Sequence, residues 1–203
     1  MKLRLEHRKI GIFRFVSHLD WLNSLKRAIR RALIPISYSS GFSPQMRINL
    51  GIPLPLGVEG LKEYFDLELE KPEDPVQVMY KLNRELPEEL HILRCEVSPS
   101  FEISKFVNFS IYDLFLREER DLDFKALGDI LYKLEKRSTK TYRIFLFQKG
   151  ESSGIVKVLF SLGLSWEDMC LIRRLGLWKF EGEIIINPFG EVEQLDKYVN
   201  KCG

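Results

Sequence analysis

The side chains best suited to chemistry lie in the first quarter of the chain, where a histidine, a glycine-containing loop and many arginines follow one another. His18 stands at the start of an apolar-periodic segment, a position typical of the first turn of a helix. The positive end of the helix dipole lowers the pKa of a histidine there, and the neutral ring can act as a base or donate a hydrogen bond. No catalytic residue is assigned from the sequence; His18 is the single candidate, with a structural role as its alternative.

Ser17 and Asp20 surround this histidine with the spacing of a helix cap. The Ser17 hydroxyl can accept a hydrogen bond from the free backbone amides of the first turn, and the acidic Asp20 is favourable near the positive end of the helix dipole. We therefore interpret both residues as a structural cap. The helix that they begin must then position His18.

Clustered positive charge marks the same region. Residues 1–51 carry ten Lys and Arg against two Asp and Glu, a formal charge of +8, whereas the remaining residues carry −6. Charge concentrated in this way beside aromatic residues favours an anionic partner, nucleic acid first among them, although many such clusters are only solvated helix faces. The basic side chains that we expect to contact RNA or another partner are Arg14, His18, Arg27, Arg30, Arg31 and Arg47.

Residues 38–44, Tyr-Ser-Ser-Gly-Phe-Ser-Pro, form a loop that adds a second kind of ligand contact. Gly41 permits a positive φ, so backbone amides and serine hydroxyls can face a phosphate or a carboxylate. Tyr38 and Phe42 can stack on unpaired bases while neighbouring arginines contact phosphates. The alternative is a tight turn in which Phe42 packs as an aromatic plug.

Composition limits the class of protein. A chain of 203 residues, 45% of them hydrophobic, can bury a substantial core as one large domain or as two of about 100 residues. No apolar run approaches the roughly 18 residues of a membrane span, and the N-terminus lacks an apolar signal segment, so we expect a cytoplasmic protein without a membrane partner. The three cysteines form no CxxC pair, and we expect neither a disulfide framework nor a metal site; they are Cys95, Cys170 and Cys202.

Hydrophobic periodicity divides the first half of the chain into elements in the order β-α-β-β-α-β. The predicted ranges are 3–16 (extended, with a turn at 9–11), 17–33 (helix), 36–39 with 47–51 (short extended pieces), 64–70 (strand), 72–86 (helix) and 91–97 (strand). This order is typical of a ferredoxin-like sandwich, so we expect residues 1–98 to form a ferredoxin-like module of an α+β protein.

A Ser-Pro-Ser sequence at residues 98–100 indicates a boundary, and we expect a second, related α+β module over residues 101–203. Its predicted elements are strands at 102–116, 141–148 and 183–187 and helices at 124–137, 166–178 and 192–200. Residues 156–164 fit a helix and a strand equally well, and we favour the helix.

Four ordered motifs carry a resemblance to a known family. They are Phe-Val-Ser-His-Leu-Asp at 15–20, the arginine-rich helix, the loop at 38–44 and Leu-Gly-Ile-Pro-Leu-Pro-Leu-Gly at 50–57. In these motifs the chain resembles the radical SAM-linked protein family, a domain of unknown function (DUF2344). The resemblance implies a role beside a radical S-adenosylmethionine enzyme. Because this chain lacks a CxxxCxxC motif, the iron-sulfur cluster and S-adenosylmethionine are expected in that partner enzyme, and no cofactor is expected in this chain.

Two hypotheses of different classes follow. The first, favoured by the resemblance, is a non-catalytic accessory protein that works with a radical SAM enzyme and presents RNA or an RNA-linked substrate on its basic N-terminal surface. The second is an RNA-processing endonuclease of the ferredoxin-like type, with His18 as general base and Arg27 or Arg31 stabilising the developing phosphorane charge. A third interpretation makes the basic face a docking patch for an acidic protein.

Overall fold

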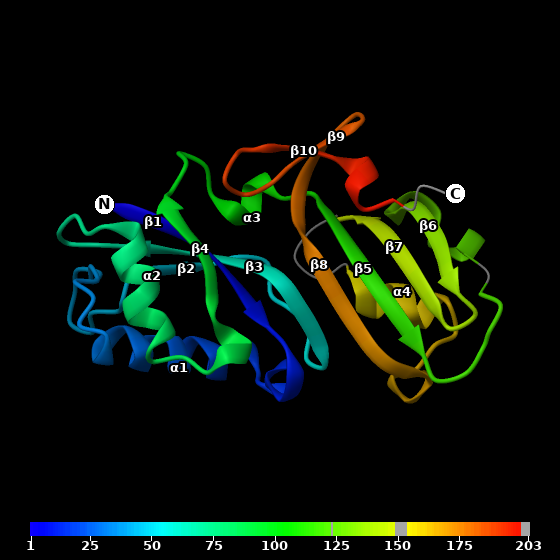
Figure 1. Cartoon of the computed structure of the whole chain (residues 1–203), viewed down its shortest axis with the longest axis horizontal. Helices are drawn as coiled ribbons and strands as arrows, with labels where there is room; N and C mark the ends of the chain where they lie inside the picture. The colour runs from blue at the N-terminus through cyan, green and yellow to red at the C-terminus, as the bar shows by residue number, and fades with distance from the viewer. Residues whose placement is uncertain (123, 149–153, 200–203) are drawn as a thin grey trace.

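The first half of the chain forms the expected succession of strands and helices (Figure 1). The computed structural model describes residues 1–122, 124–148 and 154–199. The elements of the first half are β1 (Lys2–Lys9), a 3₁₀ turn (Gly11–Phe15), α1 (His18–Arg31), β2 (Ile48–Leu50), β3 (Val58–Glu68), α2 (Pro75–Asn83), a 3₁₀ turn (Glu88–Leu90) and β4 (Ile92–Val97). The strands lie antiparallel in the order β4-β1-β3-β2, which is compatible with a ferredoxin-like module.

The cap predicted for α1 is present. The Ser17 hydroxyl accepts a hydrogen bond from the Asp20 amide at 3.1 Å and donates one to the Asp20 carboxylate at 2.7 Å. Both helices then bury one side against the same face of the sheet, because residues of α1, α2, β1 and β3 form one apolar cluster. The core side chains of α1 are Trp21, Leu25, Ala28 and Ile29.

The second half also mixes helices and strands, as expected, but its element order differs from that of the first half. The elements are α3 (Ile103–Phe106), β5 (Phe109–Leu116), a 3₁₀ segment (Phe124–Ile130), β6 (Leu131–Ser138), β7 (Thr141–Phe147), α4 (Ile155–Ser161), a 3₁₀ turn (Trp166–Asp168), β8 (Met169–Glu181), β9 (Ile184–Ile186), β10 (Val192–Gln194) and a 3₁₀ turn (Leu195–Lys197). The helix favoured for 156–164 and the strands at 141–148 and 183–187 are confirmed.

Three helix predictions in this half were wrong. Most of 166–178 is strand β8, and most of the described part of 124–137 is a 3₁₀ segment followed by strand β6. The described part of 192–200 is strand β10 and a short turn. Strand β8 buries consecutive residues on both of its faces at 176–178, so its apolar residues do not alternate cleanly with polar ones and their spacing imitates a helix. The strand expected from residue 102 begins only at Phe109, after α3.

One sheet continues through both halves of the chain (Figure 1). Strand β3 pairs with β2 near its C-terminal end and, in parallel, with β8 at Val58–Gly60. The main strand order is therefore β4-β1-β3-β8-β5-β7-β6, with β9 paired to β8 and β10 to β9. The boundary predicted at residues 98–100 lies in the connection between β4 and α3, while the sheet joins the two segments through β3 and β8.

Two buried ion pairs occur at this junction. Arg174 of β8 binds Glu63 of β3 through two nitrogens, one at 2.8 Å from Oε1. Arg4 of β1 binds Asp66 at 2.8 and 3.0 Å, and also donates to the main-chain carbonyls of Pro188 and Phe101. These guanidinium groups connect strands of the first half to segments of the second. Among the described helices, none is long and apolar enough to cross a membrane.

Candidate functional site

The predicted basic residues do not form one continuous surface. Arg27 and Arg30 are exposed on α1, and neither has an acidic partner among the described residues. The other three are partly neutralised, because Arg14 lies 3.8 Å from Glu59, Arg31 2.7 Å from Glu85 and Arg47 3.3 Å from Glu68. The free positive charge of the predicted set is therefore concentrated on α1.

The loop after α1 holds an exposed aromatic tip. Its base is closed by hydrogen bonds from the Ser39 amide to the Gln45 carbonyl at 2.8 Å and from the Gln45 amide to the Ser39 hydroxyl at 3.0 Å. Gly41 has a φ of +122°, a conformation that side-chain-bearing residues rarely adopt. Phe42 is fully exposed at the tip, so the alternative of an aromatic plug was wrong.

Arg30 and Tyr38 line the same groove, which we call the α1 groove. It has a volume of about 360 Å³ and lies between the C-terminal end of α1, residues 33–38, Met46 and the acidic Glu70. Tyr38 is 42% exposed there, and its carbonyl accepts a hydrogen bond from Arg47 at 3.3 Å. The fold thus brings together a cation and an aromatic ring that are eight positions apart in the sequence.

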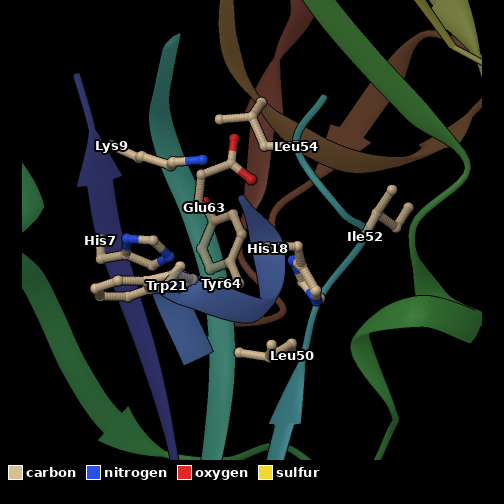
Figure 2. A pocket seen from close by; sticks show the side chains of 10 residues that line it. His7, Lys9, His18, Trp21, Leu50, Ile52, Leu54, Glu63 and Tyr64 are labelled. Carbon is tan, nitrogen blue, oxygen red and sulfur yellow. The ribbon is translucent and has the colours of Figure 1, made fainter. Parts of the chain in front are cut away.

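His18 belongs to a different place, a small polar cavity near the N-terminal end of α1 (Figure 2). We call it the inner cavity; its volume is about 30 Å³. Side chains from β1, α1, β3 and the segment after β2 surround it: His7, Lys9, His18, Trp21, Leu50, Gly51, Ile52, Leu54, Glu63 and Tyr64. Sequence reasoning did not identify His7, Lys9 or Glu63. The alternation of β1 could have indicated that His7 lies on the same side as the core residues Leu3 and Leu5.

Burial controls the electrostatics of the inner cavity. The pKa of His7 falls to about 4, chiefly because the ring is buried, and the charge of Lys9 acts in the same direction. Burial also lowers the pKa of Lys9, against the attraction of the Glu63 carboxylate. The pKa of His18 is lowered by burial and then by Lys9. Lys9 is therefore the group that acts on both imidazoles, and it favours their neutral forms.

The buried His7 should make stability fall in acid. Its folded-state pKa of about 4 lies below the ordinary value of 6.5, so between these pH values the unfolded chain binds the proton more readily. Titration of His7 therefore leaves the free energy of unfolding unchanged above pH 6.5 and lowers it as the pH falls, by about 3 kcal/mol at pH 4. Urea unfolding at pH 7 and pH 4 measures this loss, which should be largely absent in His7→Gln. Equal pH dependence in the two proteins would contradict the assignment.

The candidate His18 and the arginines of α1 are separated along the helix. Arg27 is nine positions after His18 and Arg31 is thirteen positions after it, which correspond to axial distances of about 14 and 20 Å. These arginines therefore cannot act on a phosphate that His18 contacts directly. Lys9 is the cationic side chain that lines the inner cavity beside His18.

Arg14 lies in a third place, an apolar groove of about 540 Å³ beside strand β8. Its guanidinium carbon lies 4.6 Å from the ring centre of Phe15. Phe15, Leu56 and Trp166 also line this apolar groove, and their exposed fractions are 58%, 57% and 43%. Large apolar side chains gathered in one exposed groove are typical of a surface that contacts another molecule.

Comparisons with known proteins place the chain in a family without assigning it a reaction. No curated protein matches the chain. The residues that the structure describes contain no group of three or more His, Cys, Asp or Glu side chains that could hold a metal ion. A family model described as an uncharacterized protein conserved in bacteria (DUF2344) matches residues 2–153, beyond the first 100 residues that carry most of the motifs. The chain therefore belongs to the DUF2344 family.

Proposed function

We propose that this protein is a non-catalytic RNA-binding module that works as an accessory to a radical SAM enzyme. The observation that carries the RNA part is the α1 groove, where the half-exposed Tyr38 and Arg30, which has no acidic partner in the described part of the chain, line one space. A cation beside an aromatic ring is the combination that binds single-stranded nucleic acid, through phosphate contact and base stacking. Arg27 on the same helix and Phe42 at the loop tip extend this combination beyond the groove.

Single substitutions in the α1 groove should weaken RNA binding in two distinguishable ways. Tyr38→Ala removes a stacking platform, and we expect a loss of about 1–3 kcal/mol per stacked base, or roughly 5- to 150-fold in Kd. Arg30→Gln removes one phosphate contact, so the slope of log Kd against log salt should decrease by about 0.7. Fluorescence anisotropy with a labelled single-stranded RNA measures both quantities.

The module supplies matched controls on its other helix. Tyr80 and Arg84 are exposed at α2 and its C-terminal cap, so Tyr80→Ala and Arg84→Gln make the same chemical changes away from the α1 groove. These variants should bind RNA with the wild-type Kd and salt slope. Equal losses in the α1 and α2 variants would contradict a site at the α1 groove.

The accessory part of the proposal is supported by the resemblance of the motifs at 15–20, 38–44 and 50–57 to the radical SAM-linked family. The apolar groove beside β8 supports it independently, because Leu56 belongs to the last of these motifs and is exposed there. An enzyme that docks on this groove would cover apolar surface and leave the α1 groove free for RNA.

Co-purification from the native cell tests this docking. Tagged wild-type protein should recover a radical SAM enzyme, and Leu56→Glu should lose it because a carboxylate would be buried in the interface. Val76→Glu is the matched control, since Val76 is equally exposed on α2. Failure of the wild-type protein to recover such an enzyme would contradict the accessory role, and loss in both variants would contradict the apolar groove as the docking site.

A second candidate function, RNA cleavage, is favoured by the inner cavity. The sequence offered His18 without a second acid or base, whereas the cavity sets Lys9 beside it, with a pKa lowered by burial. Two such groups can share the proton transfers of a phosphodiester cleavage. A nuclease of this kind would lose cleavage in His18→Ala and keep its RNA affinity. Absence of cleavage by the wild-type protein would exclude it for the RNA tested.

A further inference from the structure

The inner cavity contains a hydrogen-bond acceptor that has no partner among the described residues. His7 Nδ1 lies 3.0 Å from the Arg8 carbonyl, which can only accept, so Nδ1 must carry the proton. Because the pKa of His7 is about 4, the ring is neutral at physiological pH and Nε2 carries a lone pair. No described residue donates to Nε2. His7 is only 4% exposed, so a group that enters the cavity is favoured when it donates a hydrogen bond to this nitrogen.

Lys9 brings unused donors to the same cavity. Its ammonium group has three N–H bonds, and one of them is directed to the Val16 carbonyl at 2.6 Å. Figure 2 shows the amine directed toward the Glu63 carboxylate, yet no hydrogen bond or ion pair joins these two described side chains, and Glu63 is bound by Arg174. Two N–H bonds of a side chain that is 4% exposed are therefore left for another acceptor.

A hydroxyl group, of a water molecule or of a ligand, can meet both requirements at once. It can donate its proton to His7 Nε2 while its oxygen accepts from Lys9. A carboxylate has no proton for His7, and an ammonium group would be repelled by Lys9. The volume of about 30 Å³ suits the tip of a ligand, since one water needs about 10–15 Å³ on the same measure. The apolar side chains Leu50, Ile52 and Leu54 form the walls around this polar centre.

We infer that the inner cavity binds a ribose 2′-hydroxyl of the RNA strand and thereby distinguishes RNA from DNA; this inference rests on the proposed RNA-binding function. The α1 groove and the inner cavity lie near opposite ends of α1, a helix of 14 residues that is about 21 Å long. Between them, Lys26 of α1 contacts Gln45 of the loop at 3.4 Å. A strand that follows α1 over this length would contact both places. A 2′-hydroxyl is the donor and acceptor by which proteins identify RNA.

The test compares strands of one sequence on the full wild-type chain: RNA, the uracil-containing DNA and the RNA with 2′-O-methyl groups. RNA should bind about tenfold tighter than either modified strand, because a deoxyribose leaves His7 and Lys9 unpaired and a methyl group removes the donated proton. Lys9→Met should lower RNA affinity to the DNA level and leave DNA affinity unchanged. Lys26→Met, a matched lysine on α1, should preserve the ratio between RNA and DNA.

The outcomes distinguish a failure of the proposed RNA-binding function from a failure of the 2′-hydroxyl site. If the wild-type chain binds neither RNA nor DNA, the proposed function fails. If it binds all three strands equally, nucleic-acid binding remains and the 2′-hydroxyl site is overturned. The wild-type comparison uses changes in the strand, so it does not depend on the folding of a variant. Discrimination that survives in a folded Lys9→Met protein would also overturn the site.

Discussion

Glu63→Gln is expected to lower the free energy of unfolding by about 3–5 kcal/mol, because it leaves a buried guanidinium without its charge partner. Arg174 and Glu63 have side chains that are 1% and 7% exposed. Arg174 also donates to the Ile52 carbonyl at 3.0 Å, so it is held in place and cannot turn to water. The pair joins β3 to β8, and its loss should weaken the connection between the two halves of the sheet.

Urea denaturation followed by circular dichroism measures this effect. Glu68→Gln is the matched control, because Glu68 lies on the same strand but pairs with Arg47 at the surface. An exposed pair contributes less than about 1 kcal/mol. Similar losses in the two variants would show that burial of the Glu63 pair does not determine its contribution.

Arg4→Met should destabilise the protein by a similar amount, about 3–5 kcal/mol, on the sheet face opposite α1 and α2. Arg4 is completely buried and makes four hydrogen bonds, two to Asp66 and one each to the Pro188 and Phe101 carbonyls. Lys2 remains 3.0 Å from Asp66 and compensates part of the charge, but the two carbonyls lose their donor.

Chemical denaturation of Arg4→Met, with limited proteolysis as a second readout, tests this prediction. Proteolysis should begin near Phe101 and Pro188, because Arg4 holds both segments against β1. Arg8→Met is the control on the same strand, since Arg8 pairs with an exposed Glu88. A loss below about 1 kcal/mol in Arg4→Met would contradict the importance of this buried group.

Local signals explain why the first half could be predicted from sequence. Ser17 and Asp20 mark the beginning of α1, and Asp74 with Pro75 marks the beginning of α2, through contacts within a few residues. In β6 and β8 the apolar spacing also fits a helix, and strand pairing decides the structure. Strand β6 pairs with the neighbouring β7, and β8 pairs with the distant β5. Such pairing is not encoded within the segment itself, so these strands were missed.

The residues of the candidate site also differ in whether a local sequence signal identifies them. The arginines of α1 and the loop with Tyr38 are local features, and the sequence identified them. The neutralising partners of Arg31 and Arg14, Glu85 and Glu59, are more than 40 residues distant and could not be recognised. The inner cavity combines side chains from four separated segments, so only the folded chain reveals that Lys9 and His18 meet.

The most direct test of the account is ultraviolet crosslinking of a bound single-stranded RNA to the full chain, with the crosslinked peptides identified by mass spectrometry. The account predicts crosslinks on the peptides that contain Tyr38 and Phe42, because exposed aromatic rings are suited to stacking on unpaired bases. Tyr38→Ala should remove the crosslink at residue 38 and reduce the total yield. Crosslinks confined to residues 101–199 would contradict an RNA site on α1 and its loop.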